Sequence, residues 1–373
     1  IYFLRDIDMV ETSPLPKGTK RHDPSVVKDF LSTALIRVGV ESEDADLVSD
    51  VLVGADLRGV RSHGAARLSY FIVRLEKGTL NLHPNFDLKM NSKTTGLLDA
   101  DNAIGIIAAN RAIQKAMEVA EEYGAGFVGV ANSSHFGFAG YWSDIAMRRG
   151  FIGISMSNSG GRTTPTYARE SMLGTNPMSV AIPGGEYTNF LLDMATTTVA
   201  VGKIETALRE GREITDGWVS PTGDKPVLDD NGVLTYGAPL LPLGGSGMET
   251  GGHKGYGLNL MVELLCGAVT GTSFADRIRG ARGTERPAMG HLMGAIRLDG
   301  FGDPKAIQKE MDATYEIIRG AKKEPDQDRV YIHGEPEAIA IEENTRLGIP
   351  ITPAVYEQLE KIANRYGINS LPK

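Results

Sequence analysis

Apolar residues at the start of the chain recur with the spacing of an α-helix. In residues 26–35 they return every three or four positions, behind an Asp-Pro-Ser sequence that is typical of a helix start. The same spacing is found in residues 42–57, whose first turn is acidic, and in residues 61–75, which Gly78 follows. The N-terminal region is therefore predicted to be mainly helical.

The middle of the chain has a different pattern, in which one amphipathic helix is followed by short apolar runs. Residues 108–123 are predicted to form the helix, and Gly124 ends it. Four strands are predicted, at residues 126–131, 152–156, 178–182 and 190–194. An apolar helix is expected at residues 258–269, and two more helices at residues 304–318 and 353–366. These patterns indicate an α/β fold.

The order of these elements predicts how the chain is divided. Residues 1–19 lack apolar periodicity and are expected to form a flexible N-terminal arm. Residues 20–95 together with residues 304–373 are expected to form a mainly helical, discontinuous lobe, and residues 96–303 a sheet-rich lobe. A chain of 373 residues is long enough for two such lobes. Residues 218–235 have the composition of surface turns.

Composition and charge narrow the classes of function. The formal net charge of −8 and the isoelectric point near 5.5 argue against a nucleic-acid partner. No apolar stretch approaches the ~20 residues of a membrane helix, and the first residues do not follow the pattern of a secretion signal. The single cysteine, Cys266, lies in an apolar run and is expected to be a buried thiol. We therefore expect a soluble, cytoplasmic protein with no membrane partner.

Three short motifs place histidines among small residues. They are residues 61–64 (RSHG), residues 133–137 (SSHFG) and residues 251–257 (GGHKGYG). An imidazole with a reference pKa of ~6.5 exchanges protons near neutral pH, and serine and glycine leave room for a substrate. The glycines of the third motif precede the helix expected at 258–269, so free backbone N–H groups and Lys254 are suited to a diphosphate. Tight helix packing would also explain these glycines.

Two further residues are candidates because of their position. Arg67 follows His63 by four residues, so on a helix it would lie beside it and hold a substrate carboxylate; a surface salt bridge is the alternative. Asp193 ends an apolar run, where a carboxylate needs a partner such as an imidazole or a backbone N–H. It is a candidate for orienting a catalytic histidine.

Other sites are less well supported. Residues 124–129 spell G-x-G-x-x-G, but a helix precedes them and a strand follows, the reverse of the dinucleotide-binding order. A metal site built from His63, His135 and His253 with Asp193 lacks any short-range ligand spacing. A hydrolase using Ser62 or Ser134 lacks the G-x-S-x-G turn. We therefore expect no metal.

Together, these motifs resemble the malate/L-lactate dehydrogenase family, which includes the ureidoglycolate and sulfolactate dehydrogenases and the piperideine-2-carboxylate reductases. The resemblance runs from about Val26 to the C-terminus. It rests on RSHG, on residues 132–137, 173–177 and 192–196, on residues 253–258 and on residues 334–336. It implies a non-Rossmann, mixed-sheet fold with a mainly helical second lobe. It also implies NAD-dependent interconversion of a small 2-oxo acid and 2-hydroxy acid, with NADP as an alternative cofactor, by a homodimer.

The resemblance also implies roles for single residues. His135, His63 and Asp193 would be catalytic, with either histidine as the proton donor, and Ser62, Arg67 and Thr175 would bind the substrate. The cofactor would be bound by Ser159, Asp193, Met194, Ala195, His253, Lys254, Gly255, Gly334, Glu335 and Pro336.

One departure affects the substrate. Ureidoglycolate-type members resemble this chain but carry a tyrosine where it has Phe71, which makes a ureido substrate less favoured. Malate/oxaloacetate or lactate/pyruvate are the expected pairs. A cyclic imino acid on the same scaffold is the first alternative, and a metal-dependent lyase or hydrolase is the second.

Overall fold

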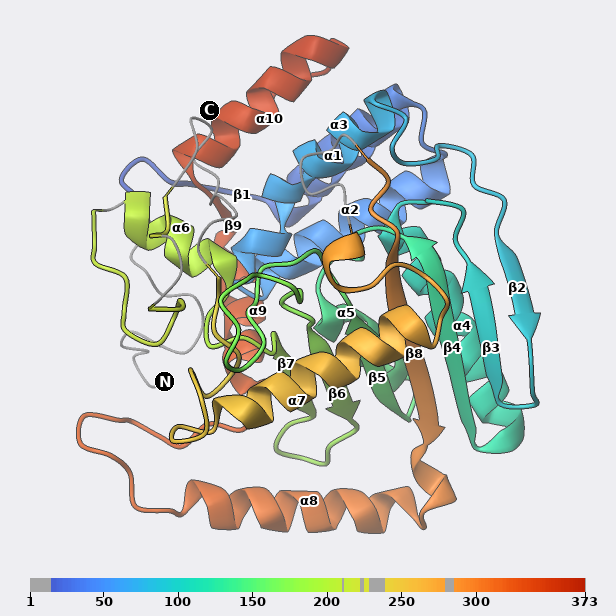
Figure 1. Ribbon diagram of the computed structural model, residues 1–373, viewed down its shortest axis with the longest axis vertical. Coiled ribbons are helices and arrows are strands. Elements are labelled where there is room, and N and C mark those ends of the chain that lie inside the picture. The colour runs from blue at the N-terminus through green and yellow to red at the C-terminus, as the bar shows by residue number, and fades with distance from the viewer. Residues whose placement is uncertain (1–14, 210, 222–224, 228–238, 279–284, 373) are drawn as a thin grey trace.

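The computed structural model describes residues 15–209, 211–221, 225–227, 239–278 and 285–372 (Figure 1). Most of the expected N-terminal arm and most of the turns expected at residues 218–235 lie outside the described residues.

A seven-stranded mixed sheet forms the centre of the molecule, in the order β2-β3-β4-β8-β5-β6-β7. Its strands are β2 (Asp87–Met90), β3 (Thr95–Asp99), β4 (Ala125–Ser133), β5 (Phe151–Ser157), β6 (Met178–Ile182), β7 (Phe190–Met194) and β8 (Met289–Arg297). Strands β3 and β4 are parallel, and the other neighbouring strands in this sheet are antiparallel. A Rossmann sheet is mainly parallel, so the expected non-Rossmann α/β fold is confirmed.

The G-x-G-x-x-G sequence is a helix end, as its order predicted. Helix α4 (Gly105–Tyr123) ends at Gly124, which has a left-handed φ of 87°, and β4 begins at the next residue. Glycine adopts this conformation without the steric cost that a Cβ imposes.

Helices cover both faces of the sheet, and alternation along the strands places the core. Phe151, Met293 and Ala295 pack on the side of α4 and α5 (Ala139–Arg148). Their neighbours Met156 and Leu292 pack on the other side, against Val262 and Cys266 of the helix that starts at Gly252. This two-residue alternation is the normal geometry of a strand buried on both faces. Cys266 is buried, as expected.

Besides α6 (Val201–Arg209), which follows β7 in the chain, five helices gather mostly at one end of the sheet (Figure 1). They are α1 (Pro24–Val38), α2 (Ser42–Leu57), α3 (Leu68–Glu76), α9 (Glu335–Leu347) and α10 (Pro353–Tyr366). Strands β1 (Lys20–His22) and β9 (Ile349–Ile351) pair antiparallel and join the two ends of the chain there. Helix α8 (Pro304–Arg319) lies across the opposite end of the sheet (Figure 1). The division into two lobes stays a prediction.

The structure corrects two expected helices. The helix expected at 258–269 begins at Gly252: α7 spans Gly252–Glu263 and continues as a π-helix over Leu264–Ala268. The glycines expected to precede the helix thus belong to its first turns. The segment that starts at RSHG is first two 3₁₀ turns, Arg61–His63 and Ala65–Arg67, and becomes α-helical only at Leu68.

Candidate active site

A buried aspartate fixes the RSHG segment. Asp56, near the end of α2, accepts a hydrogen bond of 2.7 Å at Oδ2 from the backbone N–H of Ala65. Gly64 passes so close that a Cβ on it would lie 1.9 Å from Asp56 Oδ1. Only glycine fits there, and the contact sets the path of the chain between His63 and Arg67. Burial raises the pKa of Asp56 to about 7, although the Ala65 N–H and Arg61 oppose this.

We expect the Asp56→Asn variant to gain stability relative to the native chain as pH rises. In the unfolded chain an aspartate has a pKa of about 3.9. Between about pH 4 and pH 7 the folded protein therefore binds more protons at Asp56 than the unfolded chain does, and the native free energy of unfolding falls as pH rises. Asparagine does not titrate. Urea unfolding at pH 5 and pH 7.5 measures the difference, with the exposed Asp29→Asn as the control. A difference independent of pH would contradict the prediction.

Ser62, His63 and Arg67 are joined by short local contacts. His63 Nδ1 lies 2.9 Å from Ser62 Oγ, and Arg67 Nε donates a 2.6 Å hydrogen bond to the backbone oxygen of Ser62. The bond at Nε orients the guanidinium plane while the residue stays half-buried. Arg67 therefore lies beside His63, as expected, although the segment between them is not an α-helix.

The second histidine motif follows the end of β4. Gly137 has a left-handed φ of 86°, and its backbone N–H lies 3.2 Å from His135 Nδ1. Because Nδ1 accepts this hydrogen bond, the neutral ring carries its proton on Nε2. That nitrogen is the one able to donate to a substrate.

The structure brings the two histidines together. The rings of His63 and His135 are stacked with centroids 5.3 Å apart. Tyr70 and Phe71 contact the other sides of His135, with ring centroids at 5.6 and 6.4 Å. Burial, and then the charge of Arg67, lowers the pKa of His63 to about 3 and that of His135 well below its usual value. Both rings are neutral near pH 7.

Asp193 lies in the same cavity as His63. The cavity has a volume of about 140 Å³, and its walls include Gly137, Pro177 and Glu337. Asp193 is exposed as a whole residue, but its carboxylate lies against the first turn of α5, where it accepts a hydrogen bond from the backbone N–H of Gly140. Desolvation in this cavity, reinforced by Glu337, raises the pKa of Asp193 to about 6. The expected partner was an imidazole or a backbone donor, and the structure supplies the backbone donor.

Ser159 and Thr175 form a second pair. Ser159 Oγ accepts a 3.1 Å hydrogen bond from the backbone N–H of Thr175, and the two hydroxyl oxygens are 3.5 Å apart. The backbone oxygen of Thr175 accepts a 3.0 Å bond from Thr196 N–H, which places this pair beside Met194 and Ala195 at the end of β7.

A buried polar network connects this pair to α7. Glu263, buried at 2% exposure, accepts hydrogen bonds from the side-chain amides of Asn158 (3.1 Å) and Asn176 (2.7 Å) and from the backbone N–H of Ala275 (2.8 Å). Asn176 also bonds to Asn259 at 2.9 Å. Asn176 lies in the motif at residues 173–177, but no role was predicted from the sequence for it or for the other side chains of this network. A charged residue inside the apolar run 260–269 was the available signal for Glu263, because such a carboxylate needs partners.

The first turn of α7 is packed backbone to backbone. A Cβ on Gly255 would lie 2.0 Å from the oxygen of Leu243, whose N–H bonds to Thr196. The Lys254 side chain is exposed on this turn, but the backbone N–H groups of His253 and Lys254 already bond to the oxygens of Gly247 and Gly251, so the expectation of free N–H groups is wrong for these two residues. His253 Nδ1 is buried and has no hydrogen-bond partner among the described residues. This end of α7 therefore faces the same region as the end of β7.

Residues 334–336 begin α9 next to β7. Gly334 has a φ of 99°, and the oxygen of His333 accepts a 3.0 Å bond from Leu191 N–H. The carboxylate of Glu335 is paired with Arg319 and accepts a 2.6 Å bond from Ile332 N–H. Glu335 thus has intramolecular partners that the sequence did not indicate.

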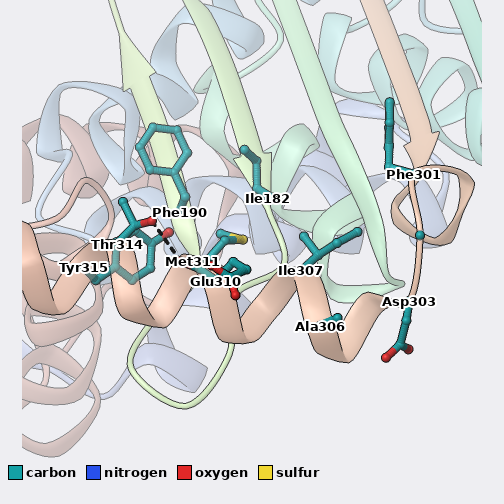
Figure 2. Close-up of a pocket in the computed structure, with 11 residues that line it drawn as sticks. Ile182, Phe190, Phe301, Asp303, Ala306, Ile307, Glu310, Met311, Thr314 and Tyr315 are labelled. Carbon is teal, nitrogen blue, oxygen red and sulfur yellow. Dashed lines mark hydrogen bonds between the residues drawn. The ribbon is translucent and has the colours of Figure 1, made fainter.

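A larger groove lies away from the histidines. It has a volume of about 640 Å³ and is formed by α8 and strands β6 and β7. Figure 2 shows Ile182, Phe190, Ile307 and Met311 along it, with Asp303 and Glu310 nearby. It holds none of the candidate catalytic residues, so size alone does not locate the site.

Within the described residues, no cluster of three or more His, Cys, Asp or Glu side chains is arranged to hold a metal ion. None of the helices in the same part of the chain is both long and apolar enough to cross a membrane.

Comparisons with known proteins agree with the observed fold. Residues 23–360 match the family model described as malate/L-lactate dehydrogenase. The malate dehydrogenase of Pyrococcus abyssi is 38% identical over 342 residues, covering 92% of this chain and 94% of that protein. The NAD(+) ureidoglycolate dehydrogenase of Escherichia coli K12 is 31% identical, with coverage of 88% and 92%.

A solved structure, that of malate dehydrogenase from Pyrococcus horikoshii OT3, superposes with a TM-score of 0.86 at 34% identity. The superposition covers 97% of this chain and 100% of the chain in the Pyrococcus horikoshii structure. The protein therefore belongs to the malate/L-lactate dehydrogenase family and is a dehydrogenase with the mixed-sheet fold of that family.

Proposed function

We propose that this dehydrogenase interconverts a small 2-hydroxy acid and the matching 2-oxo acid, of the malate/oxaloacetate or lactate/pyruvate type, with NAD as its cofactor. The stacked pair of His63 and His135 beside Arg67 carries the proposal, because it combines a proton donor with a cation suited to a carboxylate. The names of the malate dehydrogenase relatives support a dicarboxylate substrate.

In the proposed mechanism, Arg67 holds the substrate carboxylate and a histidine protonates the carbonyl oxygen. The Nε bond to Ser62 leaves the two terminal nitrogens of Arg67 for a bidentate pair. A bound carboxylate offsets the Arg67 charge that lowers the pKa of His135, so the anionic substrate favours protonation of the ring. The protonated ring, which gives up the Gly137 N–H bond at Nδ1, then donates its Nε2 proton to the oxygen that becomes the hydroxyl and returns to a neutral ring with its proton on Nδ1. Ser62 and Thr175 are proposed to contact the substrate.

The cofactor residues are proposed to act as one surface, between the end of β7 and the start of α7. Their placement fits a dinucleotide: the Ser159 hydroxyl, the backbone from Asp193 to Ala195, the buried and unpartnered Nδ1 of His253, and Lys254 at a helix N-terminus. A bound nicotinamide cofactor supplies the hydride for the carbonyl carbon. We propose that the Lys254 side chain binds its diphosphate, and that residues 334–336 complete the site.

Replacing Lys254 with alanine is expected to weaken NADH binding without unfolding the protein. Lys254 is exposed, so the substitution removes a charge and no core contact. A charge-assisted contact is worth roughly 1.5–3 kcal/mol, which corresponds to a tenfold or larger rise in the dissociation constant. Titration calorimetry with NADH measures it, and the exposed Lys309→Ala on α8 is the matched control. Equal affinity in both variants would place the diphosphate elsewhere.

A substrate panel tests the proposed function. Rates are measured with NADH and NADPH against oxaloacetate, pyruvate and piperideine-2-carboxylate. We expect the highest kcat/KM with oxaloacetate or pyruvate and NADH. A preference for piperideine-2-carboxylate would favour the cyclic imino-acid reductase instead. A higher rate with NADPH would mean that the preferred cofactor is NADP and not NAD. Loss of activity on chelation, with no cofactor binding, would favour the metal-dependent lyase or hydrolase.

We further propose that the enzyme is a cytoplasmic homodimer, as the family resemblance implies. The apolar groove beside α8, together with Phe301 and Ile317, which are 70% and 78% exposed, supports an interface that covers α8 and this end of the sheet. Sedimentation velocity measures the oligomeric state. A single monomeric species at micromolar concentration would contradict the proposed homodimer.

A further inference from the structure

A buried histidine on the central strand joins the two loops that carry the candidate site. His291 of β8 is fully buried. Its Nδ1 lies 2.9 Å from Ser157 Oγ, at the end of β5, and its Nε2 lies 2.8 Å from Ser133 Oγ, at the end of β4. Ser133 precedes His135 by two residues, and Ser157 precedes Ser159 by two.

The sheet register explains why both serines reach the ring. Ser157 is the direct neighbour of His291 across β5 and β8, so their side chains share a face. On the other side His291 faces Val130, and the β4–β8 register shifts between Val130 and Ser133. This one-residue bulge turns Ser133 to the face of His291, which regular alternation would not do.

The hydrogen bonds fix one tautomer of His291. Ser157 Oγ donates to backbone oxygens, of Asn158 at 2.9 Å or of Gly290 at 3.3 Å. It therefore accepts from His291 Nδ1–H, and Nε2 accepts from the Ser133 hydroxyl. Burial lowers the pKa of His291 to about 3, so the ring is neutral in the working range of pH and does not carry a proton through the site.

The His291 ring also supports the His135 loop through a ring stack. Phe136 stacks on His291, with centroids 4.7 Å apart and planes 13° from parallel. Its backbone oxygen accepts a 2.9 Å bond from Trp142. His135 is thus held on its N-terminal side by the Ser133 bond and on its C-terminal side by the Phe136 stack.

We propose that His291 is a positioning residue that holds the proton-donating loop of β4 in register with the Ser159 loop of β5. The proposal rests on the proposed function for the identity of those two loops. Reduction needs the proton donor and the hydride donor on one carbonyl, and a misplacement of about 1 Å can cost about 10²-fold in rate. The Ser133–His291–Ser157 bridge is the direct side-chain link between the two strand ends.

Two variants separate the parts of this bridge. His291→Phe keeps the stack on Phe136 and removes both hydrogen bonds, and His291→Gln keeps hydrogen-bonding capacity without the ring. We expect His291→Phe to lower kcat by tenfold or more, with the NADH dissociation constant changed less than threefold, and His291→Gln to retain more of kcat than His291→Phe. Native kcat in His291→Phe would overturn the proposal.

A milder variant decides the question if His291→Phe does not fold. Ser133→Ala removes one bond and leaves the ring in place, and Ser49→Ala, which removes a buried serine bond of 2.8 Å within α2, is the matched control. We expect Ser133→Ala to lower kcat by at least threefold more than Ser49→Ala at equal thermal stability. Equal kcat in the two variants would overturn the proposal.

A readout independent of turnover distinguishes this proposal from the proposed function. In ¹⁵N-histidine spectra we expect native His135 to be the Nε2–H tautomer, and Ser133→Ala and His291→Phe to mix tautomers at His135. If the native protein reduces no 2-oxo acid but these spectra change as expected, the proposed function fails and the positioning role stands. Unchanged His135 spectra in both variants would overturn the positioning role.

Discussion

Replacing His135 with alanine is expected to lower kcat for 2-oxo acid reduction by about 10²–10⁴-fold and to leave the NADH dissociation constant nearly unchanged. This is the usual value of a positioned acid or base, and the proposed mechanism assigns the proton transfer to His135. Gly137 N–H holds the neutral ring at Nδ1, so Nε2 is the nitrogen that exchanges the proton with the substrate. Steady-state rates and NADH calorimetry on the same preparation separate the two effects. The exposed His83→Ala is the control for loss of a histidine.

The comparison with His63→Ala assigns the two roles. His63 is bound to Ser62 and stacked on His135, a position suited to orienting the substrate. We therefore expect His63→Ala to raise KM for the 2-oxo acid as well as to lower kcat. If His63→Ala abolishes turnover while His135→Ala keeps most of it, the roles are reversed, and the dehydrogenase assignment is unaffected.

Local sequence patterns predicted the helices and strands whose conformation is determined by their own side chains. The bounds of α2, β6, β7 and α10 agree with those expected from apolar periodicity alone. The histidine motifs were also found from the sequence, because small residues beside an imidazole are an unusual combination. The elements and motifs that were predicted correctly are those determined by residues close together in the chain.

The start of α7 was predicted wrongly because its glycines have a non-local cause. A Cβ on Gly252 would lie 1.9 Å from the oxygen of Gly245, and one on Gly255 would lie 2.0 Å from that of Leu243. The residues are therefore glycines inside a helix, although glycine disfavours helices. From the sequence alone, this low helix propensity of glycine indicates a loop. Only the neighbouring backbone shows why glycine is required inside the helix.

The central strand β8 was not predicted for a similar reason. Gly290 and Gly294 interrupt its apolar pattern, and each faces a close neighbour: a Cβ on Gly290 would lie 1.7 Å from the oxygen of Cys266, and one on Gly294 2.5 Å from the ring of Phe127. The roles of His291 in β8 and Glu263 in α7 were not predicted either. Their partners lie up to 158 residues away in the chain, so no local spacing reports them.

Replacing Arg67 with lysine is expected to lower kcat/KM for the 2-oxo acid by tenfold or more, mainly through a higher KM. Lysine keeps the positive charge but has no planar fork, so it loses the bidentate pair with the substrate carboxylate and the Nε bond to Ser62. A charge-assisted bond of this kind is worth roughly 1.5–3 kcal/mol, or about 10–150-fold in binding. Steady-state kinetics on oxaloacetate measures the effect, and Arg37→Lys on the exposed face of α1 is the matched control. Native kcat/KM in Arg67→Lys would mean that the carboxylate binds elsewhere, and that the stacked histidines act on a substrate held by another cation.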